Sequence, residues 1–92
     1  MVVPPFRRSP SEADAELEAV TLTTVIERHP SLLSGDELCQ EVAEDPTNLV
    51  EQDAVRNAIR ELVRAGLLQR SGEIVLPTRA AIKFKELFGV IA

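Results

Sequence analysis

Residues 52–65 constrain the fold most, because their apolar side chains recur at helical spacing. At about 100° per residue, four apolar side chains fall within about 60° of one direction: Val55, Ala58, Ile59 and Leu62. The opposite side is polar and carries Asp53, Asn57, Arg60 and Arg64, with Arg56 at its flank. Gly66 follows where a left-handed residue often ends a helix. The spacing therefore predicts an amphipathic helix with one buried and one exposed face.

A second helix is predicted upstream, over residues 12–29. Ser9 or Ser11 can cap its start, and acidic residues in its first turns favour the positive end of the helix dipole. Pro30 ends it, because the residue before a proline is pushed out of the α region. The run 20–26 is β-branched and would also suit a strand, but helix-forming residues flank it.

Between these two helices the sequence predicts one strand rung and a short helix. Leu32 and Leu33 form a short apolar segment that is long enough for one pairing position in a β-sheet. Ser34 and Glu37 have the spacing of a capping box, in which each side chain accepts a hydrogen bond from the other residue's backbone amide. The short helix then runs to about residue 43 and buries Leu38, Cys39 and Val42, and the cluster at 45–48 predicts a turn.

The C-terminal part predicts a hairpin and a last helix. Two short strands, 67–70 and 73–76, are separated by Ser71 and Gly72, which suit a tight two-residue turn. Thr78 can cap a helix that runs to about residue 88, with an apolar face made of Ala81, Phe84, Leu87 and Phe88.

Composition excludes several classes of protein. A chain of 92 residues forms one small domain with a modest core, which a partner subunit can complete. A single cysteine, Cys39, forms no internal disulfide, and with the single histidine, His29, it makes no zinc site of the usual four-ligand kind. No apolar run reaches membrane-spanning length, and no secretory signal is evident, so we expect a cytoplasmic protein.

Catalytic patterns are also missing from the sequence. There is no nucleophile beside a base, no glycine-rich phosphate loop and no carboxylate pair in a recognisable context. Acidic residues gather around residues 36–45, but such a cluster is usually solvated surface. We therefore expect no enzyme activity, no cofactor and no metal.

Charge is distributed unevenly along the chain, whose net charge is −5. Residues 1–53 hold 3 basic and 12 acidic residues, a net of −9, whereas residues 54–92 hold 7 basic and 3 acidic residues, a net of +4. An acidic protein as a whole is an unusual partner for nucleic acid. Nucleic acid stays a candidate partner of the basic half, because an uneven charge distribution between the two halves is itself a sign of nucleic-acid or membrane contact.

The order of predicted elements resembles a winged helix-turn-helix domain of the MarR or PadR type. Residues 54–68 match the recurrent pattern V-x-x-A-L-x-x-L-x-x-x-G-L-L, with Ile59 where leucine is usual, and residues 76–81 are similar to the step from the wing to the next helix. The resemblance implies a mainly α fold with a three-helix core, a short β-hairpin wing and a C-terminal helix. The predicted domain covers residues 12–92 and follows a flexible arm, residues 1–11.

The resemblance also implies a function, namely a sequence-specific DNA-binding transcriptional regulator with helix 52–65 as its recognition helix. Arginine can pair with guanine, and asparagine or glutamine with adenine, so the base-reading candidates are Gln52, Arg56, Asn57 and Arg60. Phosphate contacts are expected from Arg64 and Arg70, and also from Lys83 and Lys85 if their face points the same way. A homodimer on double-stranded DNA is expected, held through helices 12–29 and 78–91.

An interaction module without DNA binding is the alternative function. Glu51 and Asp53 lie at the start of the predicted recognition helix, where carboxylates repel phosphates. The predicted wing is also too short to reach far along a DNA groove. These features, together with the net charge of −5, favour the alternative in which the partner is a protein.

Overall fold

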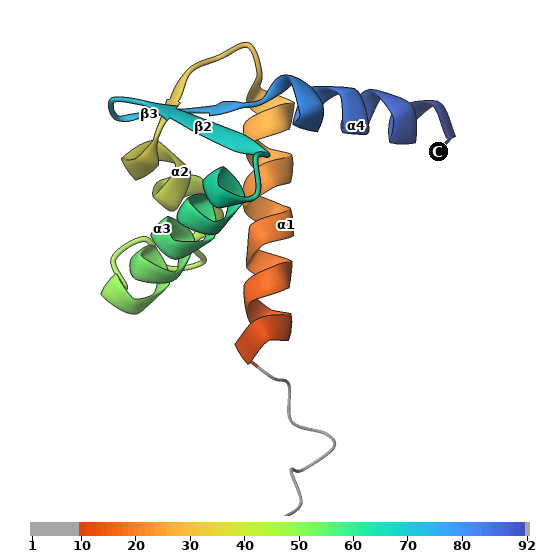
Figure 1. Cartoon of the computed structure of the whole chain (residues 1–92). Helices are drawn as coiled ribbons and strands as arrows, with labels where there is room; N and C mark the ends of the chain where they lie inside the picture. The colour runs from red at the N-terminus through yellow and green to blue at the C-terminus, as the bar shows by residue number, and fades with distance from the viewer. Residues whose placement is uncertain (1–9, 92) are drawn as a thin grey trace, which may run out of the picture.

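The computed structural model describes residues 10–91, with side chains described for residues 13–87. It is mainly helical, and within that range it contains four helices and a small three-stranded antiparallel sheet (Figure 1). Residues 1–9 of the predicted arm lie outside the described range. The arm prediction is wrong for residues 10 and 11, which are helical, because the first helix already begins at Pro10. Proline suits this first position, since its missing amide would have no partner there.

Helix α1 (Pro10–Arg28) packs chiefly against the third helix and confirms the helix prediction for the β-branched run. Thr21 and Val25 are buried on its inner side. The Thr24 hydroxyl donates to the carbonyl of Val20 at 2.8 Å, one turn back along the same helix. Tertiary burial and helical flanks therefore override the strand preference of these residues.

Strand β1 (Leu33–Ser34) and helix α2 (Gly35–Val42) follow, joined by the predicted capping box. The Glu37 amide donates to the Ser34 hydroxyl at 3.1 Å, and the Ser34 amide donates to the Glu37 carboxylate at 3.0 Å. Leu38 and Cys39 are buried, as the sequence predicts. The predicted turn at 45–48 is also present, with the Asn48 amide donating to the Asp45 carbonyl at 2.9 Å.

Helix α3 (Leu49–Arg64) begins three residues earlier than predicted and ends one residue earlier. Asn48 is its N-cap, and the Asn48 side chain accepts hydrogen bonds from the amides of Val50 at 2.9 Å and Glu51 at 3.4 Å. The apolar pattern could not show this start, because Leu49 and Val50 are exposed. The predicted core stripe is confirmed, since all four of its residues are buried: Val55, Ala58, Ile59 and Leu62.

Strands β2 (Leu68–Ser71) and β3 (Ile74–Pro77) form the hairpin, and the strand order in the sheet is β1-β3-β2. The predicted turn is displaced by one residue, because Ser71 pairs with Ile74 and the turn consists of Gly72 and Glu73. Gly72 has a φ of +63°, and within the described range no residue other than glycine has positive φ. A positive φ at the first of the two turn residues, but not at the second, is typical of a type II′ turn. Such a turn places glycine first, and this fixes the pairing register of β2 and β3.

Helix α4 (Arg79–Ile91) extends past the predicted end at residue 88. The Thr78 hydroxyl caps it by accepting from the Ala81 amide at 3.2 Å. The predicted apolar face is only partly right, because Ala81 is buried whereas Phe84 and Leu87 are 58% and 55% exposed. Figure 1 shows the reason: α4 meets the rest of the protein near its first turn and then runs away from it.

The core lies between α1, α2, α3 and the sheet. The main cluster of buried side chains comes from these three helices and all three strands: Val25, Leu33, Leu38, Cys39, Val55, Ile59, Leu62, Leu68 and Val75. Ala58 of α3 and Ala81 of α4 are buried as well. None of the helices described between residues 10 and 91 is long and apolar enough to cross a membrane.

Candidate nucleic-acid interface

The outer face of α3 carries an exposed polar row. Its members recur at spacings of four, three and four residues, which keeps them on one side of a helix: Asp53, Asn57, Arg60 and Arg64. The Arg60 guanidinium donates to the Asn57 side-chain oxygen at 3.3 Å. This contact holds two base-reading candidates side by side while their remaining donors face solvent.

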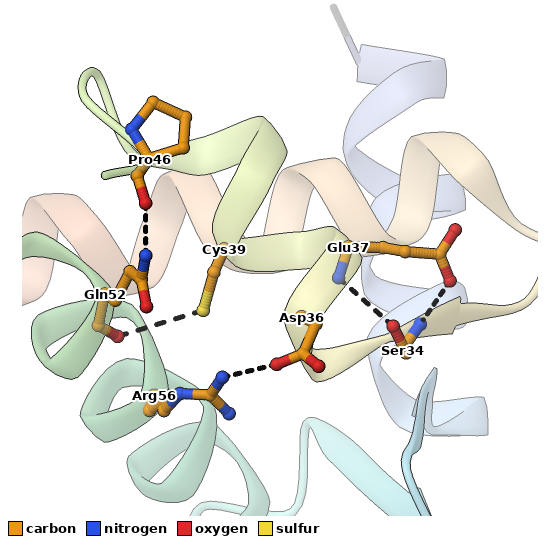
Figure 2. A network of polar contacts seen from close by, with 7 residues as sticks. All are labelled: Ser34, Asp36, Glu37, Cys39, Pro46, Gln52 and Arg56. Carbon is orange, nitrogen blue, oxygen red and sulfur yellow. Dashed lines mark hydrogen bonds and ion pairs between the residues drawn. The ribbon is translucent and has the colours of Figure 1, made fainter. Parts of the chain in front are cut away.

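Arg56 lies beside this row and reaches toward the start of α2. Its guanidinium forms a hydrogen-bonded ion pair with the Asp36 carboxylate (Figure 2). The side chain of Arg56 is 41% exposed and that of Asp36 is 80% exposed, so the pair is open to solvent and to a ligand. The Asp36 carboxylate raises the pKa of Arg56, which therefore stays charged.

Arg70 approaches Arg56 from strand β2, across a glycine. A β-carbon placed on Gly35 would lie 3.3 Å from one terminal nitrogen of Arg70 and 3.8 Å from one terminal nitrogen of Arg56. The absence of a side chain at Gly35 lets both guanidinium groups approach the first turn of α2. They line a polar hollow of about 180 Å³ between α2, α3 and the hairpin, together with Asp36 and Glu73.

Gln52 has a different role from its predicted neighbours. Its side-chain amide donates to the Pro46 carbonyl (Figure 2), and its backbone carbonyl accepts from the buried Cys39 thiol at 3.8 Å. The half-buried Gln52 therefore holds the α2–α3 connection against α3. Burial raises the pKa of the Cys39 thiol, which keeps it protonated at neutral pH.

The remaining candidates for phosphate contact do not line this polar hollow: Arg64, Lys83 and Lys85. Arg64 is at the end of α3, where its guanidinium is 3.5 Å from the Glu61 carboxylate. Lys85 lies on α4 next to Ile26 and His29, at the end of α1, and Lys83 belongs to another surface of α4. The structure thus brings Arg56 and Arg70 together and joins Asn57 to Arg60, whereas the α4 lysines are separate from both.

The carboxylates are distributed differently from the sequence expectation. Glu51 turns away from the arginines, because its side chain accepts from the Glu44 amide at 3.2 Å and lines a groove beside α1. Asp53 is exposed within the polar row, as predicted. Asp36 is the residue of this site that the sequence did not predict, since it is 20 residues from Arg56 and only the fold brings the two together.

Chemically, the arrangement offers guanidinium and amide donors to an extended anion. Such donors can bind phosphate oxygens or the acceptors on base edges. Among the described residues, no group of three or more His, Cys, Asp or Glu side chains is placed to hold a metal ion. No protein-family model matches the chain, and no match was found among curated proteins or solved structures.

Proposed function

We propose that this chain is a winged helix-turn-helix protein of the MarR or PadR type that binds double-stranded DNA and regulates transcription. The element order α1-β1-α2-α3-β2-β3 supports this fold, as does the pairing of β1 with β3 beside the hairpin. In this proposal α2 and α3 are the helix-turn-helix, β2 and β3 are a short wing, and the protein acts in the cytoplasm.

One observation carries the proposal: four of the five arginines in residues 54–92 lie on or beside the outer face of α3, and only Arg79 lies elsewhere, on α4. Arg56, Arg60 and Arg64 follow one another at intervals of four residues, and Arg70 joins Arg56 over Gly35. A recognition helix in the major groove places its exposed side chains against base edges and its flanking cations against phosphates. Glu51 is the carboxylate most expected to repel DNA, but its side chain accepts a hydrogen bond from the Glu44 amide instead.

We assign the roles from these contacts. Asn57 and Arg60 are the base-reading pair, because both are exposed on the outer face of α3. Arg56, Arg64 and Arg70 bind phosphates, and DNA competes with Asp36 and Glu61 for two of them. Gln52 acts indirectly by positioning the start of α3. The DNA-bound form is a homodimer held through α1 and α4.

A fluorescence titration against random and genomic duplexes at several salt concentrations tests DNA binding directly. Binding is expected at low salt and should weaken steeply as salt rises, because released counterions dominate the affinity. Arg60→Ala should weaken binding by about tenfold or more, since a good bidentate base contact is worth about 1–3 kcal/mol. Lys85→Ala removes the same charge from another surface and is the matched control. Absence of binding at low salt overturns the proposal.

A protein-interaction module is the second candidate, and the start of α3 favours it. Leu49 and Val50 are 71% and 76% exposed there, and two of the arginines are already paired with carboxylates of the chain. A partner protein in defined stoichiometry, whose binding Leu49→Ser abolishes and Arg60→Ala leaves unchanged, would favour this second function over the first.

A further inference from the structure

Two apolar side chains prolong the polar row of α3 at its N-terminal end. Leu49 and Val50 lie four and three residues before Asp53, so both are one turn from it on the same side of the helix. They are 71% and 76% exposed, which are the two largest exposed fractions among the large apolar residues that the structure describes. From its start onward, the outer face of α3 therefore carries an apolar pair, a carboxylate, an amide and two cations.

Neither Leu49 nor Val50 has a structural role that its exposed side chain serves. Asn48 caps the helix by accepting from the amides of Val50 and Glu51, which involves only their backbone. The buried residues of α3 begin at Val55. An apolar side chain that stays in water contributes no hydrophobic stabilisation. Burial of this apolar pair therefore requires a contact from outside the chain.

Asp53 also has no structural role within the chain. A carboxylate interacts favourably with the helix dipole only within the first turn, and Asp53 is the fifth residue of α3. Within the part of the chain that the structure describes, its carboxylate forms no hydrogen bond and no ion pair. An ionised carboxylate only accepts hydrogen bonds. The exposed Asp53 oxygens are therefore available to a ligand that donates.

The groups on this face correspond to those that bases display in the major groove of B-DNA. Thymine presents a C5-methyl group, cytosine an amino group at N4, adenine an acceptor beside a donor, and guanine two acceptors. Apolar side chains contact the methyl group, and carboxylates accept from the cytosine amino group. Each kind of side chain along the outer face of α3 therefore suits one base.

We propose that Leu49 and Val50 contact the C5-methyl group of a thymine, and that Asp53 accepts a hydrogen bond from N4 of a nearby cytosine. The inference rests on the proposed function, because it names bases that the same recognition helix selects. Val50 to Arg60 spans about 15 Å at 1.5 Å per residue, which corresponds to about four or five base pairs at 3.4 Å each. The half-site has thymine and guanine near its two ends, with cytosine and adenine between them.

The Asp53 carboxylate selects by exclusion as well as by attraction. Guanine and thymine present acceptors to the major groove, and an ionised carboxylate has no proton to donate to them. If either base replaced the cytosine, the carboxylate would lose water and face another acceptor. Specific interfaces use such repulsion against wrong partners together with attraction to the right one. Asp53 is then a specificity-determining residue, not only a charge that repels phosphates.

Selection from random duplexes by the full chain identifies the bound site, and single-base variants of that site test Asp53. At one position the unmodified chain should prefer cytosine about tenfold, and Asp53→Asn should move that preference to adenine, with which an amide pairs. Asp14→Asn removes the same charge from the exposed start of α1 and should keep the cytosine preference. If Asp53→Asn strengthens binding to all duplexes equally, Asp53 only repels phosphates and the proposal is wrong.

Uracil in place of single thymines tests the methyl contact, because uracil lacks only the C5-methyl group. At one thymine this change should weaken binding by the unmodified chain about three- to fourfold, the value of one buried methylene-sized group. The double variant Leu49→Ala, Val50→Ala should bind the thymine and uracil duplexes equally. Leu32→Ala shortens another exposed leucine and should keep the difference. Equal binding of both duplexes by the unmodified chain at every thymine overturns the proposal.

The outcomes separate this inference from the proposed function. A chain that binds no duplex at low salt overturns both. A chain that binds duplexes but shows neither the cytosine preference nor the methyl effect overturns the inference alone. If the double variant loses a stoichiometric protein partner and keeps its preference for thymine over uracil, Leu49 and Val50 form a protein-binding surface and the proposal is wrong. Circular dichroism confirms that every variant is folded.

Discussion

Replacing Thr21 with valine should stabilise the protein. Thr21 is fully buried on the inner side of α1, and its hydroxyl is the one side-chain oxygen or nitrogen atom of the described residues that is buried without a hydrogen-bond partner. In the unfolded chain this hydroxyl binds water, so folding removes a hydrogen bond and returns none. Valine has nearly the same shape and places a methyl group where the hydroxyl lies, so the close packing at this buried position is kept.

The expected gain follows from the desolvation of one hydroxyl. Burial of an unsatisfied polar group lowers stability by about 1–3 kcal/mol in protein mutational data, so Thr21→Val should raise the free energy of unfolding by about 1–2 kcal/mol. For a domain of this size that gain corresponds to a rise in Tm of roughly 5–10 °C. Urea and thermal unfolding, followed by circular dichroism, measure both quantities.

Thr23→Val is the matched control, because Thr23 lies two residues away on the same helix and is exposed. The change in unfolding free energy for the control should stay within about 0.5 kcal/mol. A Thr21→Val protein that is less stable than the unmodified chain, or no more stable than the Thr23→Val control, would refute the reasoning. The Thr21 hydroxyl would then have a partner in the folded protein.

Three further predictions concern a cap, a turn and a thiol. Ser34→Ala removes half of the capping box of α2 and should lower the free energy of unfolding by about 0.5–2 kcal/mol in urea titrations. Gly72→Ala places a β-carbon at a φ of +63° and should lower the free energy of unfolding by about 1–2 kcal/mol, although nothing within 4 Å would clash with it. Burial raises the pKa of Cys39 above its ordinary value of 9.0, so the folded state holds this proton more tightly than the unfolded state. The stability that results is present below about pH 9 and is lost as pH rises above it, so unfolding titrations between about pH 8 and 11 should show a decline that is smaller in Cys39→Ala.

Local signals predicted most of the helices and strands. The capping box, the core stripe of α3 and the helix end at Pro30 each depend on a few neighbouring residues, and all three are present in the structure. The start of α3 was missed because Asn48 caps two residues that are apolar yet exposed. The turn was misplaced by one residue because the sequence alone did not show which turn position the glycine would occupy.

The candidate interface was less predictable, because it depends on contacts between distant residues. Helical spacing placed Asn57, Arg60 and Arg64 on one face, and they are exposed there. Spacing could not show that Asp36 would reach Arg56, or that Gln52 would turn toward Pro46. The same limit applies to α4, since its sequence predicts an apolar face but not whether the chain itself covers that face.

The salt dependence of DNA affinity in matched variants tests the central proposal most directly. The logarithm of the binding constant should fall linearly with the logarithm of salt concentration, and Arg70→Ala should lower the steepness of that line by about one phosphate contact. Lys85→Ala should leave the steepness unchanged, because Lys85 lies beside the end of α1 rather than near α3. Equal effects of the two substitutions, or no measurable binding at the lowest salt concentration, would contradict a DNA interface built on α3 and β2.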